Sequence, residues 1–257
     1  PFQIKFKPVY CLVLHANTFA GKAATQAARE RGYDLILVER VPWDDPPDNS
    51  FVIDTSDPKD IENLVRKLEK ECLRVDFLIT CPALNANEWV DADFRAFEEF
   101  SLVDWDRIIR ENLNAQMLFC RFFGKRMRER GMGRILQLAS NVALDPHDPR
   151  HFSGMSTEFG LVHAPAAYAC AMAGVLALTR HLAAEYQDSG VLINSMVFGP
   201  LAEAEPEPHL ESYKNRIPLG RIMTAEDLKN ALDIFLDPES SYITGQNLNA
   251  DGGVSIW

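Results

Sequence analysis

Residues 163–186, HAPAAYACAMAGVLALTRHLAAEY, are rich in alanine and predict a long helix entered through Pro165. The chemically most versatile side chain in this segment is Tyr168, whose phenol can donate or accept a proton. Met172 follows one helical turn later on the same face. A thioether carries no charge and makes only weak hydrogen bonds. The pair therefore predicts a proton-transfer group that has no charged neighbour one turn away, with Met172 filling space in the core.

The elements that must position this phenol can be read from an alternation of short apolar runs and longer helical patterns. Because the strands are apolar throughout, they predict a parallel sheet covered on both faces. We expect a single-domain α/β fold over residues 1–257, a Rossmann-type doubly wound parallel sheet. The predicted strands are 9–15, 34–39, 51–54, 76–80, 133–140, 190–198 and 246–250, and the predicted helices are 21–31, 57–72, 103–131 and 163–186.

Loops and composition narrow the function. The segment 41–50 is too rich in Pro and Asp to be helical, and the long loops 141–166 and 199–212 are expected to frame a ligand crevice. A net charge of −11 argues against nucleic acid and anionic membranes as partners. No apolar run reaches the roughly 20 residues that span a bilayer, and the N-terminus lacks a signal-peptide core.

The titratable clusters do not predict a metal site. The 5 cysteines are scattered without CxxC spacing, which indicates reduced thiols in a cytoplasmic protein. Three histidines share one loop with two aspartates, but their spacing matches no ligand pattern, and we expect no metal. These residues are Asp145, His147, Asp148, His151 and His163.

Several motifs resemble the short-chain dehydrogenase/reductase family over essentially the whole chain. The closing segment contains Thr244-Gly245-Gln246 and Asp251-Gly252-Gly253, as in that family. WDRIIRENL resembles the helix that carries the family's Asn. RILQLAS resembles the strand that ends in the family's catalytic Ser. The Tyr168 helix resembles the helix that carries the family's acid/base Tyr. The resemblance implies an NAD(P)-dependent oxidoreductase acting on a CH–OH or C=O group, with Asn112, Ser140 and Tyr168 as catalytic residues.

The first departure from the family is Met172, which stands where the family has a lysine. In the family the lysine ammonium lowers the pKa of the tyrosine and binds the nicotinamide ribose. Neither task is open to a thioether. The resemblance with this substitution predicts a degenerate member.

The second departure lies in the phosphate-binding loop, which reads LHANTFAG. His15 and Phe19 replace two of the three family glycines, and only Gly21 remains. Because glycine lets the backbone approach a diphosphate, these side chains are expected to obstruct the dinucleotide. We therefore expect no cofactor or a weakly bound one.

At other positions of the expected cofactor site, some residues match the family and others differ from it. Glu39 ends the second strand where the family has a ribose-binding acid, and Asp54 matches its adenine-contacting aspartate. Glu203, however, replaces a hydroxyl that usually meets the cofactor, and a carboxylate repels a pyrophosphate. Half of the adenosine site thus resembles the family's site, whereas its phosphate and nicotinamide ends do not.

Three functions are compatible with this mixture. The main hypothesis is a family member without ordinary NAD(P)-dependent hydride transfer: a pseudoenzyme that binds a small polar ligand or joins an active paralogue in a mixed oligomer. The first alternative is an atypical but active NAD(P)-dependent dehydrogenase/reductase for an alcohol, carbonyl or sugar-like substrate. The second is a cofactor-independent Ser/Tyr enzyme of halohydrin-dehalogenase type. In those enzymes an aromatic residue also replaces the glycine at Phe19, but an arginine stands at the position of Met172.

We also expect a homo-oligomer, a dimer or tetramer, because family members pair through the Tyr168 helix and its neighbour. Small residues along this helix permit close packing: Ala169, Ala173, Gly174 and Ala177.

Overall fold

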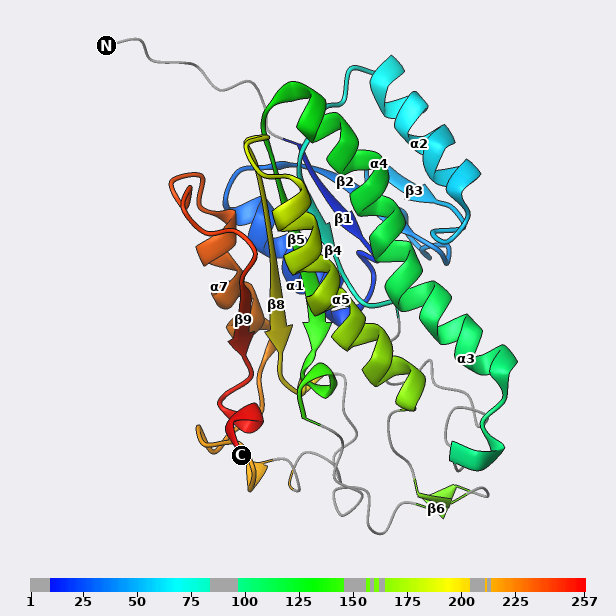
Figure 1. The fold of residues 1–257 in the computed structure, drawn as a ribbon, viewed down its shortest axis with the longest axis vertical. Coiled ribbons are helices and arrows are strands. Elements are labelled where there is room, and N and C mark those ends of the chain that lie inside the picture. Colours follow the sequence, from blue (N-terminus) through cyan, green and yellow to red (C-terminus); the bar gives the residue numbers. More distant parts are fainter. Residues whose placement is uncertain are drawn as a thin grey trace.

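A computed structural model describes residues 10–83, 97–145, 156–157, 160–161, 165–203, 211 and 214–257. Its centre is a sheet of 7 strands in the order β3-β2-β1-β4-β5-β8-β9, and every neighbouring pair is parallel (Figure 1). This confirms the predicted single-domain Rossmann-type sheet. The strands are β1 Tyr10–Leu14, β2 Asp34–Glu39, β3 Ser50–Val52, β4 Val75–Thr80, β5 Gly133–Ser140, β8 Val191–Phe198 and β9 Asn247–Ala250. A separate two-stranded antiparallel pair consists of β6 Ser156–Thr157 and β7 Gly160–Leu161.

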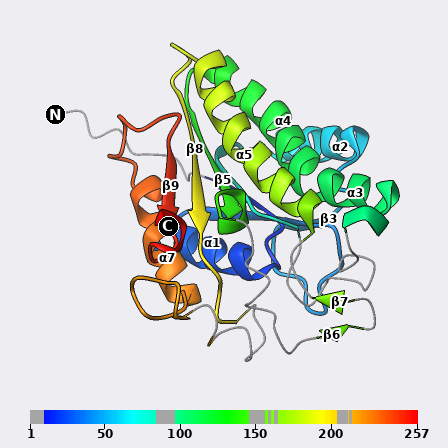
Figure 2. The same cartoon turned by 60° about the horizontal axis from the view of Figure 1, so that its bottom comes forward.

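Helices cover both faces of the sheet (Figure 2). The helices are α1 Phe19–Glu30, α2 Pro58–Lys70, α3 Leu102–Ile109, α4 Ala115–Arg130, α5 Ala166–Glu185 and α7 Ala225–Leu236. Successive strand residues point to opposite faces, so Cys11 and Val13 join the core under α1 and α7, while Leu12 and Leu14 join the core under α2 and α4. The continuous apolar strands of the sequence are thus buried on both sides.

The helix from 103 to 131 is interrupted. Between α3 and α4 the residues Arg110–Asn114 form a π-helical turn, and Gly131, with φ 72, caps the C-terminus of α4. A π turn inserts an extra residue into the helical register and is frequent at functional sites. The turn contains Asn112, which makes it part of the candidate site.

Helix starts follow capping chemistry. The Thr18 side chain accepts the backbone N–H of Gly21, so α1 begins at Phe19, two residues before the predicted start. Thr224 and Asp227 form a capping box at the start of α7. This last helix was absent from the predicted elements, although its capping box is readable in TAED.

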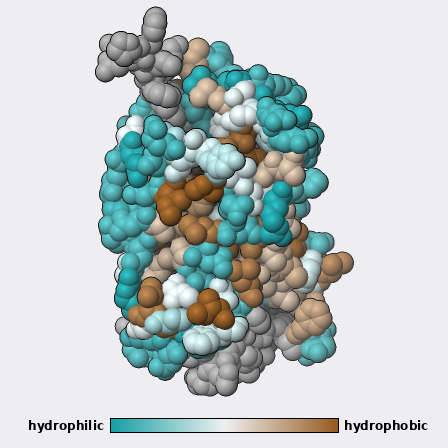
Figure 3. All heavy atoms as spheres, turned by 60° about the vertical axis from the view of Figure 1, so that its left-hand side comes forward, coloured by the Kyte–Doolittle hydropathy of each residue, from teal (hydrophilic) through white to brown (hydrophobic). Residues whose placement is uncertain are grey.

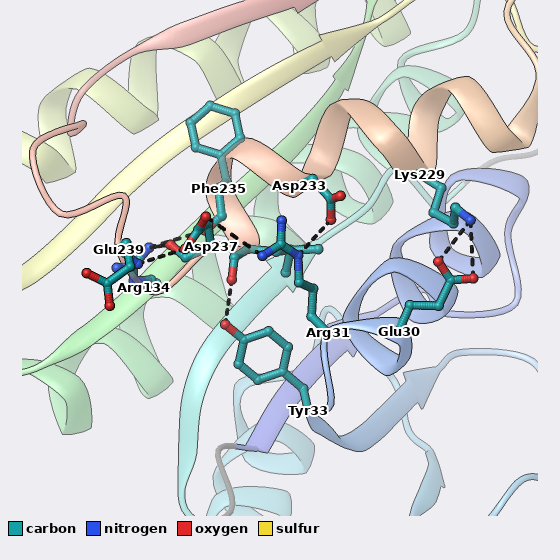
Figure 4. Close-up of polar contacts among 10 residues, drawn as sticks. Glu30, Arg31, Tyr33, Arg134, Lys229, Asp233, Phe235, Asp237 and Glu239 are labelled. Carbon is teal, nitrogen blue, oxygen red and sulfur yellow. Dashed lines mark hydrogen bonds and ion pairs between the residues drawn. The ribbon is translucent and has the colours of Figure 1, made fainter. Parts of the chain in front are cut away.

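Polar contacts join α1 and α7 at the amino edge of the sheet, opposite the strand ends that carry the candidate site (Figure 4). The Arg31 guanidinium lies 3.0 Å from the Asp233 carboxylate, and the Tyr33 hydroxyl donates to the Leu236 carbonyl at 2.6 Å. Arg134 of β5 donates to three carbonyls where α7 ends: Phe235, Asp237 and Pro238. A cation is favourable at a helix C-terminus, so Arg134 acts as a side-chain cap for α7.

In the described part of the chain, α5 alone is long and apolar enough to cross a bilayer by length and composition, with a mean hydropathy of 1.2. This helix packs on β5 and β8, and its Met172 and Val175 are fully buried. Burial in the core of the α/β sandwich therefore explains part of the apolar character of α5.

Candidate active site

Tyr168 and Ser140 come from two packed elements. Ser140 is the last residue of β5, and Tyr168 lies in the first turn of α5, where Pro165 is the N-cap. The Tyr168 side chain is 7% exposed and belongs to the same cluster as Ala139 and Val142, which bracket Ser140 in sequence. The structure thus brings the predicted hydroxyl pair to one region at the carboxyl edge of the sheet. The Ser140 hydroxyl donates to the Asn141 side-chain oxygen at 3.3 Å.

Met172 lies beneath this pair. It is fully buried, and its sulfur accepts the backbone N–H of Ser140 at 3.4 Å. The sulfur is therefore in direct contact with the strand end that carries the serine. The prediction that Met172 fills the core agrees with this packing.

Asn112 is held by its own helix and by the end of β4. Its amide oxygen accepts the Ala83 N–H at 3.0 Å, and its amide nitrogen donates to the Ile108 carbonyl at 3.1 Å. The residue is fully buried. These contacts fix the segment after β4 against the π turn, so Asn112 positions the edge of the site.

His15 follows β1 and is fully buried with φ 56, a left-handed backbone conformation that suits glycine. Its ring nitrogens contact the Cys81 carbonyl at 2.8 Å and the Thr55 hydroxyl at 3.1 Å. Burial lowers the pKa of His15 to about 4, so the imidazole is neutral at pH 7. A carbonyl can only accept, so Nδ1 carries the proton and Nε2 accepts from Thr55. No motif in the sequence points to Thr55.

Gly21 has a packing reason to be glycine. A Cβ at this position would lie 2.1 Å from the His15 carbonyl oxygen and 2.8 Å from the Ala16 Cα. The first turn of α1 therefore touches the backbone of the loop after β1. Phe19, which the motif resemblance aligns with a family glycine, is partly buried against the core under α1.

Glu39 ends β2 as predicted and is 4% exposed. Its carboxylate accepts the backbone N–H of Asn17 at 3.1 Å and that of Arg40 at 2.8 Å. The first of these bonds joins the end of β2 to the loop after β1. Glu39 and His15 thus belong to the same group of strand ends.

Asp54 is exposed and engages its own loop. Its carboxylate accepts the Ser56 hydroxyl at 2.7 Å and the Ser56 N–H at 2.9 Å. The hydroxyl bond and the N–H bond of Ser56 hold the pKa of Asp54 below its usual value. Asp54 lies near Thr55 in sequence but makes none of the contacts that hold His15.

Glu203 has a partner at the start of α7. Its carboxylate accepts the N–H of Ala225 at 3.2 Å, at the first residue of α7. A carboxylate is stabilised at a helix N-terminus. Glu203 thus has a structural partner in α7, and its repulsion of a pyrophosphate stays a prediction.

The residues that the structure describes contain no group of three or more His, Cys, Asp or Glu side chains able to hold a metal ion. Asp145 is described and lies 3.2 Å from the Arg216 guanidinium. The other members of the His-rich loop, His147, Asp148, His151 and His163, lie outside the described residues.

The arrangement of strand ends and helices matches known proteins. The family model described as "Enoyl-(Acyl carrier protein) reductase" covers residues 20–255. The chain belongs to the short-chain dehydrogenase/reductase family. The resemblance found in the motifs is thereby confirmed at the level of the family.

Two curated relatives in this family match the chain over nearly its full length. The chain is 28% identical to the D-threitol dehydrogenase of Mycolicibacterium smegmatis, over 99% of this chain and 96% of the relative. It is 27% identical to a 3-oxoacyl-[acyl-carrier-protein] reductase of Thermotoga maritima, over 96% of this chain and 97% of the relative. Both names describe oxidoreductases, so these relatives do not support the pseudoenzyme hypothesis.

A solved structure gives the same fold. The short chain dehydrogenase of Leptospira borgpetersenii with bound NAD⁺ superposes with a TM-score of 0.84 at 23% identity, covering 97% of this chain and 94% of that one. This likeness confirms the architecture of the short-chain dehydrogenase/reductase fold.

Proposed function

We propose that the protein is an NAD(P)-dependent oxidoreductase for the CH–OH or C=O group of a small polar, sugar-like substrate, working without the family's lysine. The observation that carries this proposal is the placement of Tyr168 beside the Ser140 strand end, in a chain whose full-length relatives are dehydrogenases and reductases. The D-threitol dehydrogenase among them supports a polyol-like substrate.

The residues fit a dinucleotide in part. Glu39 at the end of β2 is a suitable acceptor for ribose hydroxyls, and Asp54 is an exposed carboxylate on the next loop. His15 and Phe19 stand in place of glycines on the phosphate side. We therefore expect weak binding of NAD(P), held mainly through its adenosine half. When bound, the cofactor supplies or receives the hydride.

The chain's own residues then handle the proton. The Tyr168 phenol donates a proton to the substrate oxygen in reduction and takes it back in oxidation. The Ser140 hydroxyl, at the neighbouring strand end, is the donor that orients this oxygen. Met172 supplies no positive charge to stabilise a phenolate, so oxidation, which uses the phenolate as base, should accelerate as the pH rises.

A second candidate, the non-catalytic homologue, is favoured by two specific observations. The Met172 sulfur accepts the hydrogen bond of the Ser140 N–H. The His15 side chain, directly after β1, contacts Thr55 after β3 and Cys81 after β4. Under this second candidate function, the protein binds a small polar ligand or completes a mixed oligomer with an active paralogue.

We also propose that the protein forms a homo-oligomer, but the small residues available for packing at the interface differ from those expected. Gly174 has a reason within the chain to be glycine, because a Cβ there would meet Leu113 at 2.9 Å. Ala173 and Ala177 remain exposed on α5. The face beside β9 and α7 also carries separate apolar areas within a mostly hydrophilic surface (Figure 3), which offers a second contact region.

Titration with NAD⁺, NADH, NADP⁺ and NADPH tests the proposal, followed by turnover assays on polyols and on 3-oxoacyl thioesters. A ligand at 100 times its Kd stabilises the native state by about 2.7 kcal/mol, which thermal shift and calorimetry both detect. Saturable binding of one cofactor with cofactor-dependent turnover supports the oxidoreductase. No binding at millimolar concentration of all four overturns it in favour of the non-catalytic homologue.

A further inference from the structure

His15 lies at the topological switch point of the sheet. From β1 the chain first builds β2 and β3 on one side and then returns to add β4 on the other side, so β1 and β4 are adjacent at the reversal (Figure 1). Ligands of open α/β sheets bind in the crevice outside the carboxyl ends of the strands at this point. His15 is the first residue after β1, and Cys81, which it contacts, is the first residue after β4.

One imidazole connects three strand ends. Nδ1 donates to the carbonyl of Cys81, and Nε2 accepts from the hydroxyl of Thr55, three residues beyond the end of β3. Both nitrogens are therefore satisfied, and the ring has no exposed surface. These are the contacts that a neutral heteroaromatic ligand with one donor and one acceptor would make.

The backbone of His15 is strained for a side chain. Its φ of 56 belongs to the region that glycine adopts freely. The conformation is held by Thr18, whose N–H and hydroxyl both donate to the His15 carbonyl. Residues in such conformations are retained when surrounding contacts over-determine them, and they concentrate at functional sites.

We propose that the His15 side chain is a built-in occupant of the switch point: its ring fills the space between the ends of β1, β3 and β4, and the phosphate side of a nucleotide can approach these strand ends closely only after the imidazole leaves. His15 is thus the residue that sets the nucleotide affinity of this protein. The nucleotide part rests on the proposed function, whereas the occupancy of the site by the ring can be tested without it.

The test is the variant His15→Gly, whose backbone suits the observed φ, with His15→Asn as the matched control. Asparagine tolerates the left-handed region and retains a donor and an acceptor. Imidazole is the probe for the vacated site, followed by AMP and NAD⁺ in calorimetry. We expect imidazole at millimolar concentration to raise the Tm of His15→Gly saturably, with no such effect on the unmodified protein or on His15→Asn.

AMP and NAD⁺ should bind His15→Gly at least 10-fold more tightly than the unmodified protein. If imidazole restores His15→Gly but no nucleotide binds either protein, the built-in occupant is supported and the NAD(P)-dependent function fails. If the unmodified protein binds NAD⁺ and turns over while imidazole leaves His15→Gly unchanged, the occupant is overturned and the function stands.

Thr55→Val is a second test of the proposal for His15, to be used if His15→Gly does not fold. It removes only the hydroxyl that donates to Nε2 and leaves the backbone of His15 in place. The weakened hold on the ring should raise AMP affinity several-fold over the unmodified protein. An unchanged affinity would contradict the proposal.

Discussion

The sulfur of Met172 accepts the backbone N–H of Ser140 at 3.4 Å, from a position without solvent exposure. Met172, which the motif resemblance aligns with the family's lysine, is thus packed into the structure of the candidate site. A charged group at position 172 would lose this hydrogen bond and would be buried among Ala139, Val142 and Val175.

Met172→Lys is therefore expected to lower the free energy of unfolding by about 2–4 kcal/mol, because a buried ammonium is poorly solvated. In the folded variant, an ammonium beside Tyr168 should move the pH–rate profile of oxidation to lower pH. Denaturant titration and pH–rate measurements check the two effects. Met172→Leu, which preserves volume, should cost less than about 1.5 kcal/mol. Equal losses in both variants would show that charge is not the reason.

Tyr168→Phe should lower kcat/KM by roughly 10²–10⁴-fold, the usual contribution of a general acid/base, without changing dinucleotide affinity. Steady-state kinetics and calorimetry separate the two quantities. Tyr33→Phe is a suitable control, since it removes one phenolic hydrogen bond, to Leu236, at the opposite edge of the sheet. Activity of Tyr168→Phe equal to that of the control would remove Tyr168 from the reaction.

Stability should depend on pH through His15. Its folded pKa of about 4 lies below the ordinary value of 6.5, so between these values the unfolded chain binds more protons. The contribution of His15 to the free energy of unfolding is therefore complete above about pH 6.5. It is lost as the pH falls toward 4, by about 3 kcal/mol in total. Urea titrations from pH 4 to 7.5 measure this slope. His15→Asn, which does not titrate, should lose this component of the slope, and an unchanged slope would assign it to other groups.

Gly21→Ala should be strongly destabilising, because its Cβ would lie 2.1 Å from the His15 carbonyl oxygen. We expect a loss of about 3 kcal/mol or more, at the upper end for overpacked sites. Gly32→Ala is the comparison: Gly32 has φ 80, but a Cβ added there would meet no atom within 4 Å, so only backbone strain of about 1 kcal/mol applies. Thermal unfolding of the two variants shows whether the steric clash of the added Cβ or the strained backbone conformation causes the larger loss of stability.

Arg134→Met should lower the free energy of unfolding by about 1–3 kcal/mol, since it removes a charged donor from three carbonyls at the end of α7. Arg134→Lys keeps the charge but lacks the planar fork, so it should recover part of this loss. Dinucleotide affinity should be the same in both variants, because the cap lies at the amino edge. A change in affinity that exceeds the change in stability would contradict this separation.

The sheet could be predicted because its strands are continuous apolar runs. The ranges 34–39 and 133–140 coincide with β2 and β5, and the other sheet strands differ from their predicted ranges by at most two residues at either end. The start of α1 at Phe19 was missed although Thr18 is a good N-cap. The π turn around Asn112 has no periodic signal in the sequence, because it depends on how α3 and α4 pack on neighbouring elements.

The candidate site could be predicted in its residue types but not in its contacts. Ser140, Tyr168 and Met172 were found through motif spacing within and between two elements. The partners of His15 lie 40 and 66 residues away along the chain, so only the folded sheet brings them together. The same applies to Glu203, whose partner Ala225 at the start of α7 lies 22 residues further along the chain.

The contacts between α1 and α7 have a mechanical consequence. Arg31 with Asp233 and Tyr33 with Leu236 lie toward the ends of these helices that are remote from the crevice, whereas Glu30, also near the end of α1, reaches Lys229 nearer the middle of α7 (Figure 4). The helix α1 has 12 residues and so extends about 18 Å from these contacts. A tilt of about 5° around such a pivot displaces the crevice end by roughly 1.5 Å over that length. Because these contacts hold α1 at the end remote from His15, a small rotation of α1 about them would move the loop that holds His15.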